Sequence, residues 1–188
     1  MTLTRTLGGL ALVAMLAMPA FADDITDAMD QARKAYQSGD LTNAKQSLDL
    51  ASQLIGQKNA ESFATLLPNA LPGWKADKAT TQALGAVGFG ASMASRSYHN
   101  AKGDTVEIQI TGDSTVVGQI AAFLSNPALA GAMGKLVRVG KQRAIQDNDG
   151  NVKMVVANKF LVAVEGSADA AAKLAYAQAI DVSKLSKL

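Results

Sequence analysis

Few side chains in this sequence have the types and spacing that catalysis requires. His99 is the only histidine and there is no cysteine, which excludes sites with several imidazoles, thiol nucleophiles and thiolate metal sites. An acid–base hydrolase would have to pair His99 with a carboxylate such as Asp104 or Glu107. No Gly-x-Ser-x-Gly elbow marks a serine nucleophile. We therefore expect no catalytic residues, and the His99 hydrolase is kept as an alternative.

Carboxylates are the other groups with catalytic potential. Asp104, Glu107, Asp113 and Glu165 could converge once the chain folds, but nothing in their spacing requires it. Carboxylates on a half-buried sheet usually belong to its solvated face. We favour that interpretation over a catalytic pair.

Two loops resemble ligand-binding motifs without matching them. Asp147, Asp149 and Asn151 offer oxygen ligands, but an EF-hand has its glycine sixth and a glutamate twelfth, where this loop has Gly150 fourth and Asn158 twelfth. We expect a solvated β-turn and no metal site, with cation binding left open. The glycines of residues 85–90 fit neither the P-loop nor the dinucleotide spacing, so no cofactor is expected and a mobile lid is one hypothesis.

The charge balance limits the classes of partner. The chain has 18 basic and 16 acidic side chains. Without Arg5, which lies in the N-terminal segment of residues 1–22, the balance is 17 minus 16, or +1. So small a net charge argues against nucleic-acid binding and against a polybasic membrane patch.

The first 22 residues have the layout of a cleavable signal peptide. Arg5 precedes an apolar run from Leu7 to Met18, and the small-x-small triplet ending at Ala22 is a cleavage site. The run is about twelve residues, whereas a membrane-spanning helix needs about 20, and no second long run follows. We expect cleavage after Ala22 and a soluble, periplasmic or secreted protein without a membrane span.

Residues 23–67 are predicted to form a helical hairpin followed by a short helix. Small and large apolar residues recur every three or four positions on both sides of Ser38-Gly39-Asp40, whose glycine and aspartate suit the end of one helix and the start of the next. Phe63, Leu66 and Leu67 suggest the short third helix. Pro68 then ends the helical region.

The hairpin resembles one tetratricopeptide-type repeat. Tyr36, Gly39-Asp40-Leu41, Ala44 and Leu48 carry the resemblance, while Ala28 and Gln31 depart from it. Arrays of such repeats need about three copies to bury a continuous core. One copy implies a helical hairpin that packs on the rest of the chain or on a partner.

Residues 68–188 are predicted to form an α+β domain. The Leu67-Pro68 and Leu71-Pro72-Gly73-Trp74 pieces resemble the start of uncharacterised exported bacterial proteins, a likeness that implies a compact α+β fold and no particular reaction. Alternating apolar residues and turn signals indicate about five antiparallel strands, with helices packed mainly on one face. The expected strands are 92–99, 105–110, 136–147, 152–157 and 160–166, with helices near 113–124 and 168–180.

The leading functional hypothesis is a non-enzymatic binding or scaffolding protein that acts on another envelope component. Its candidate contact residues are Tyr36, Leu41, Leu48 and Leu54 on the hairpin. The alternative is a carrier of a small apolar ligand, with a pocket between sheet and helices. The candidate lining residues of that pocket are Trp74, Phe89, Val106, Ile108 and Phe160. The sequence leaves the oligomeric state open.

Overall fold

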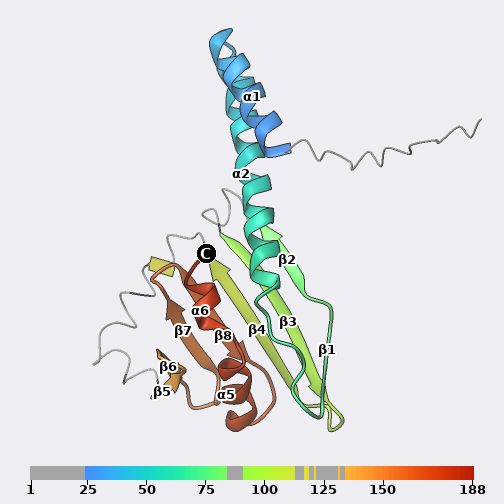
Figure 1. Cartoon of the computed structure of the whole chain (residues 1–188), viewed down its shortest axis with the longest axis vertical. Coiled ribbons are helices and arrows are strands. Elements are labelled where there is room, and N and C mark those ends of the chain that lie inside the picture. Colours follow the sequence, from blue (N-terminus) through green and yellow to red (C-terminus); the bar gives the residue numbers. More distant parts are fainter. Residues whose placement is uncertain (1–23, 84–90, 113–116, 119–120, 122–130, 132–133) are drawn as a thin grey trace, which may run out of the picture.

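The chain folds into an antiparallel sheet from which a helical hairpin projects (Figure 1). The computed structural model describes residues 24–83, 91–112, 117–118, 121, 131 and 134–188. This α+β arrangement, with two N-terminal helices, confirms the predicted fold class. Among the described residues, no helix combines the length and the apolar character that crossing a membrane requires.

The hairpin consists of α1 (Asp24–Gln37) and α2 (Leu41–Ala64). Asp40 begins α2 by accepting a hydrogen bond of 3.0 Å from the backbone N–H of Asn43, as the sequence predicts. The prediction of a separate third helix was wrong, because α2 continues unbroken to Ala64. The apolar pattern changes near Gly56 because the helix exchanges contacts with α1 for contacts with the sheet.

Alanines form the seam between the two helices. Ala28 and Ala32 of α1 and Ala44 and Ala51 of α2 are all at most 6% exposed. Side chains this small let two helix backbones approach closely. The hairpin therefore holds together without burying large apolar side chains in its seam.

Within the described part of the chain the sheet has eight antiparallel strands, and the expectation of about five was wrong. Their order is β1-β3-β4-β8-β7-β6-β5, and β2 also pairs with β3. The strands are β1 (Trp74–Ala76), β2 (Thr80–Ala83), β3 (Ser92–Asn100), β4 (Thr105–Gly112), β5 (Lys135–Val139), β6 (Gln142–Gln146), β7 (Val152–Val156) and β8 (Phe160–Glu165).

Two local causes account for the extra strands. Residues 136–147 are not one strand, since Gly140 adopts a φ of +59° and turns the chain between β5 and β6. β1 and β2 are short and mostly exposed, so they lack the apolar alternation that marks a strand in sequence. Both pair with β3, β1 near its end and β2 near its start.

Two short helices close the chain, α5 (Ala170–Gln178) and α6 (Val182–Leu185). Asp169 and Asp181 cap them by accepting backbone hydrogen bonds of 2.7 and 3.0 Å. The helix predicted near 113–124 lies largely outside the described residues. The residues of this range that are described, 117–118 and 121, are helical. The lid hypothesis for residues 85–90 also falls outside the described residues.

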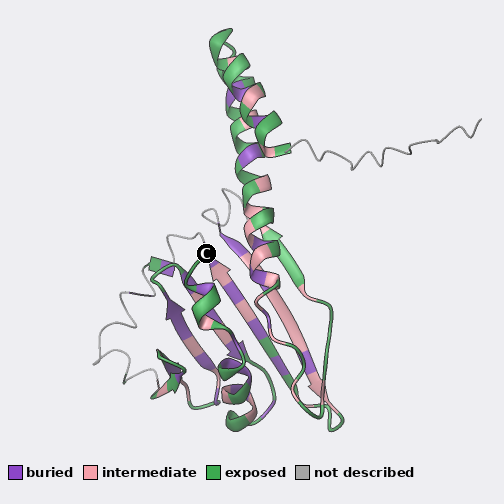
Figure 2. Cartoon of the chain, viewed as in Figure 1, coloured by how far each residue is buried: buried purple, intermediate pink, exposed green. Residues whose placement is uncertain are grey.

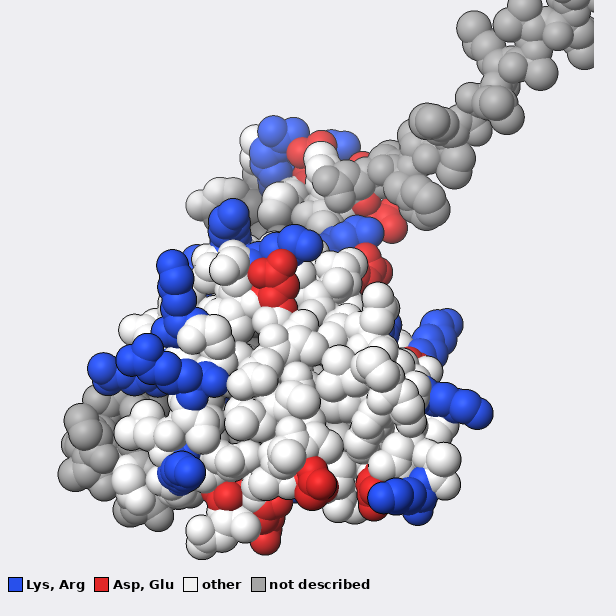
Figure 3. Space-filling view, turned by 60° about the horizontal axis from the view of Figure 1, so that its bottom comes forward, with Lys and Arg blue, Asp and Glu red and all other residues white. Residues whose placement is uncertain are grey.

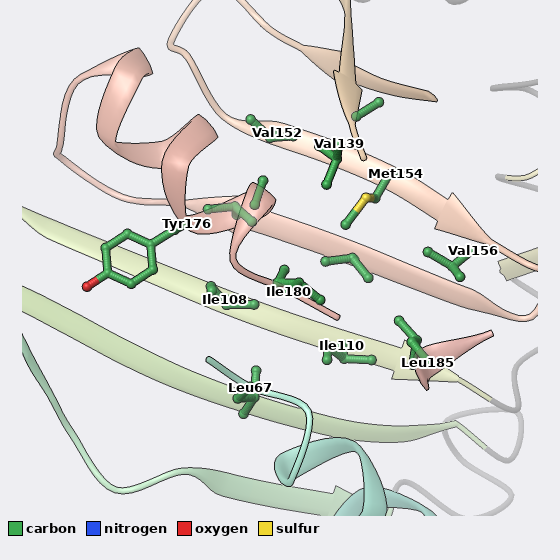
Figure 4. Packing of buried hydrophobic residues seen from close by; sticks show 14 of the residues in the cluster. Leu67, Ile108, Ile110, Val139, Val152, Met154, Val156, Tyr176, Ile180 and Leu185 are labelled. Atoms are coloured by element: carbon green, nitrogen blue, oxygen red, sulfur yellow. The ribbon is translucent and has the colours of Figure 1, made fainter. Parts of the chain in front are cut away.

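The main core lies between one face of the sheet and the ends of the helices (Figures 2 and 4). Phe63 at the end of α2 meets Phe160 of β8 edge to face, with ring centroids 5.4 Å apart. Tyr176 of α5 and Leu185 of α6 are fully buried in the same cluster. The other sheet face carries a smaller cluster of Val117, Ala121, Val155 and Leu161. Helical residues thus contribute to both faces.

Gly56 marks the place where α2 crosses the sheet edge. A Cβ at this position would lie 3.1 Å from the Cβ of Ala83 and 3.5 Å from the Oγ of Ser92. A larger residue would push the helix away from β2 and β3. Before this glycine α2 contacts α1, and after it Ala60 and Phe63 are buried.

Candidate functional site

Large apolar side chains of the hairpin point to solvent in two stripes. On α2, Leu41, Leu48 and Ile55 recur every seven residues and are 66%, 56% and 38% exposed. On α1, Met29 and Tyr36 have the same spacing and are 48% and 69% exposed. A seven-residue repeat keeps side chains on one side of a helix. Each helix therefore carries an uncovered apolar stripe.

The two stripes lie on the same side of the hairpin. At about 100° per residue, each stripe is rotated from the alanine seam of its own helix by roughly 50–70° in the same sense. Because the helices are antiparallel, equal rotations bring both stripes to one side. We call the five residues Met29, Tyr36, Leu41, Leu48 and Ile55 the hairpin face.

Three of the four predicted hairpin residues belong to this face: Tyr36, Leu41 and Leu48. Leu54 lies on the other side of the seam and is half-buried. Met29 and Ile55 were missed as contact residues. Their seven-residue spacing from Tyr36 and Leu48 was the available signal.

The borders of the hairpin face carry both signs of charge. Arg33 lies between Met29 and Tyr36 along α1 and pairs with Asp30 at 3.0 Å. Lys45 lies between Leu41 and Leu48 along α2 and pairs with Asp49 at 2.7 Å. Exposed pairs of this kind add little stability. They leave the face without a strong field of either sign.

The proline-bounded segment of residues 67–74 is fastened to the sheet and α5. The carbonyl oxygen of Pro68 accepts hydrogen bonds from the Tyr98 hydroxyl at 2.7 Å and from Nη1 of Arg96 at 3.2 Å. The Tyr176 hydroxyl oxygen accepts one from the Leu71 N–H at 3.2 Å. Burial raises the pKa of Tyr98 to about 12 and also raises that of Tyr176.

Four of the five residues proposed to line a ligand pocket lie among the described residues, and all four occupy packed positions. Trp74 lies edge to face against Tyr176, with centroids 5.4 Å apart. Val106, Ile108 and Phe160 are at most 3% exposed and belong to the main core. Phe89 lies outside the described residues.

His99 faces a carboxylate other than the two proposed for it. Its Nδ1 lies 3.6 Å from Oδ1 of Asp77, and both side chains are exposed to solvent. Asp104 instead accepts a hydrogen bond of 2.8 Å from the side-chain amide of Asn100. The arrangement lacks the water-excluded setting in which a tuned acid–base pair works.

Two of the four candidate carboxylates are neighbours across the sheet. Glu107 of β4 and Glu165 of β8 are register partners, and Lys153 pairs with Glu165 at 3.0 Å. Both glutamates are exposed. Glu107 also borders a polar hollow of about 210 Å³, lined further by Thr80, Gln82, Met93, Ser95 and Gln109. Asp113 lies outside the described residues.

The loop that resembles a calcium site is organised around a lysine. Lys173 of α5 is 2% exposed, and its ammonium donates to the Asp149 carbonyl at 2.6 Å, Oδ1 of Asn151 at 2.9 Å and the Gly166 carbonyl at 2.9 Å. Asp147 holds the loop by accepting from the N–H groups of Asp149 and Asn151. Burial raises the pKa of Asp147, but hydrogen bonds from these residues outweigh it and lower the pKa.

Oxygen atoms suited to a metal ion are thus bound to an ammonium group of the chain itself. No cluster of three or more His, Asp or Glu side chains suited to a metal occurs among the described residues. This role of Lys173 was not predicted, because in the sequence it is one more polar residue in an alanine-rich helix. Its position in α5 carries no motif that could have identified it.

Comparison with known proteins found no matching family model, no similar curated protein and no similar solved structure. The resemblances described from the sequence therefore remain predictions.

Proposed function

We propose that the protein is a non-enzymatic scaffold of the bacterial periplasm that binds another envelope protein through the hairpin face. The observation that carries the proposal is the packing of the hairpin, in which alanines fill the seam and five larger apolar side chains are exposed together on one side. A contiguous apolar surface on a protein marks a site of association. No described cluster of residues supports a reaction equally well.

The shape of the hairpin face favours a helical partner. Leu41 and Ile55 are fourteen residues apart, so the α2 stripe is about 21 Å long, or nearly four helical turns. The α1 stripe lies on the same side of the hairpin, and the two stripes together offer an apolar surface on which a third helix can pack. The mixed charges of Asp30, Arg33, Lys45 and Asp49 favour a partner helix with a neutral apolar face.

The predicted signal peptide supports a location outside the cytoplasm. Cleavage after Ala22 would leave α1, which starts at Asp24, close to the new N-terminus. The absence of cysteine means that folding there requires no disulfide. The hairpin would be available to a partner directly after export.

Site-specific photocrosslinking in the cells that naturally produce the protein tests the proposal. A photoreactive residue at Leu48 should yield one dominant protein adduct, and Leu41→Ser in the same chain should reduce it at least fivefold. Leu50 provides the matched control, because it is 48% exposed but lies on the opposite side of the seam. Equal adducts from positions 48 and 50, or no adduct at position 48, would contradict the proposal.

A further inference from the structure

The hairpin of strands β5 and β6, residues 135–146, concentrates positive charge. Lys135, Arg138, Lys141 and Arg143 are all exposed, and residues 134–146 include no aspartate or glutamate. Figure 3 shows Lys and Arg side chains gathered on the left of the molecule, the side where Figure 1 places these strands. We call this segment the basic hairpin.

Two of these charges face each other directly. Arg138 and Arg143 are register partners in the antiparallel pair, so their Cα atoms are only about 4.5–5.5 Å apart. Like charges in directly opposite positions destabilise a sheet. Neither arginine forms an ion pair within the part of the chain that the structure describes. The pair is unfavourable for folding unless an anion joins it.

An apolar side chain shares the surface of the arginine pair. Leu136 precedes Arg138 by two residues, so both project from the same face of β5, and Leu136 is 51% exposed. β5 is the last strand in the order of the sheet. An exposed leucine beside two guanidinium groups at a sheet edge matches the boundary between lipid headgroups and acyl chains.

We propose that the basic hairpin binds an anionic phospholipid surface. Arg138 and Arg143 together hold a lipid phosphate, since guanidinium groups donate paired hydrogen bonds to such oxygens. Leu136 enters the region below the headgroups. Lys135 and Lys141 reach neighbouring phosphates with their flexible side chains. The interaction is peripheral and reversible.

The chemistry of the basic hairpin favours lipid over other anions. It contains no aromatic side chain on which a nucleobase could stack. A free phosphate would gain nothing from Leu136, whereas a bilayer provides both anionic groups and an apolar layer. The near-neutral net charge of the whole chain argues against a polybasic patch only on average. The acidic residues lie elsewhere in the sequence, so the charge of residues 134–146 is positive.

Vesicle co-sedimentation of the purified protein tests the assignment. The protein should bind vesicles with about one third phosphatidylglycerol at about 50 mM NaCl, and bind pure phosphatidylcholine vesicles at least tenfold more weakly. Arg138→Gln with Arg143→Gln should lower the association constant about 10- to 30-fold. Leu136→Ser should lower it about fivefold and leave the preference for the anionic lipid.

Lys75→Gln with Lys78→Gln is the matched control. It removes the same charge from exposed positions at and just after β1, at the other end of the sheet, and should change binding less than about twofold. Equal loss in both double variants would overturn the proposal. Displacement by about 10 mM inorganic phosphate, or equally tight binding of single-stranded DNA, would also overturn it.

A thermal scan separates loss of binding from loss of folding. Because the substitutions relieve a like-charge contact, the arginine variant should unfold at the same temperature as the parent protein or slightly above it. A variant that binds poorly at an unchanged melting temperature supports the proposal. Retained lipid binding by this folded variant would refute it.

Discussion

The projecting hairpin and the sheet use apolar residues in opposite ways. In the hairpin, Ala28 and Ala51 are buried while Tyr36 and Leu48 are exposed. In the sheet, the large side chains Ile108 and Val162 are completely buried. Burial of apolar area scales with side-chain size, so the sheet gains far more stability per residue. The hairpin instead keeps its large side chains available for association.

The same difference implies unequal local stability. α1 has 14 residues, which is marginal for an isolated helix in water, and it packs mainly through small side chains. The sheet buries a continuous cluster that extends from β3 to β5 and includes residues of α5 and α6. We expect the hairpin to open locally well below the free energy that unfolds the sheet.

The largest effect should come from Ile108, at the centre of the sheet. Ile108→Ala removes a fully buried side chain and leaves a cavity, which should lower the free energy of unfolding by about 4 kcal/mol. Leu48→Ala on the hairpin face should change it by less than about 0.5 kcal/mol. Urea unfolding followed by circular dichroism measures both. Similar losses in the two variants would remove the contrast between the regions.

Lys173→Met should have the next largest effect. Methionine has a similar length but cannot donate, so the oxygens of Asp149, Asn151 and Gly166 lose a buried partner. Unsatisfied acceptors of this kind should cost about 3 kcal/mol together. Lys159→Met, at an exposed turn, is the control and should be nearly neutral. An unchanged midpoint of urea unfolding for Lys173→Met would show that the three hydrogen bonds of the Lys173 ammonium are dispensable.

Alkaline titration should weaken the sheet region through Tyr98. Its pKa is about 12 in the folded protein and about 10 in the unfolded chain. Since the folded pKa is the higher, the contribution of Tyr98 is complete below pH 10 and is lost between pH 10 and 12, by about 2 kcal/mol.

Denaturant midpoints measured from pH 9 to 12 check this dependence. Tyr98→Phe should flatten the profile, although it also removes a hydrogen bond to Pro68. Tyr36→Phe is the control, since Tyr36 is 69% exposed, and should leave the slope unchanged. A parent profile that stays flat to pH 12 would contradict the burial argument.

The smallest effect should stay within the hairpin. Ala51→Leu overfills the alanine seam and should cost about 1.5 kcal/mol locally. Hydrogen exchange should accelerate in α1 while β4 amides keep their protection. Gln46→Leu adds the same side chain at an exposed position and should leave exchange unchanged. Faster exchange in β4 would show that the two regions unfold as one unit.

Local patterns were sufficient for the parts of the fold that obey them. The turn at Ser38-Gly39-Asp40 and the pairing of residues 92–99 with 105–110 were predicted because each has capping or alternation signals within a few residues. β1 and β2 were missed because pairing with β3 holds them in place, and most of their own residues are polar or exposed. A pattern read over a few neighbouring residues does not include the strand with which they pair.

The candidate sites show the same limit. Exposure of Tyr36, Leu41 and Leu48 followed from the seven-residue spacing only once the alanine seam identified the inner side of each helix. The buried hydrogen bonds of Lys173 arise from tertiary contacts. The position of Arg138 opposite Arg143 arises from the register of β5 and β6. No spacing in the sequence distinguishes these side chains from ordinary surface charges.

The crossing at Gly56 gives α2 the mechanics of a lever. The helix has 24 residues and is about 36 Å long. Phe63 anchors its C-terminal end in the core, and Gly56 rests against Ala83 of β2. A tilt of about 10° about that support would move the far end of α2 by roughly 4 Å. A load on the hairpin face would thus be transmitted as torque to β2 and β3, where the glycine sets the fulcrum.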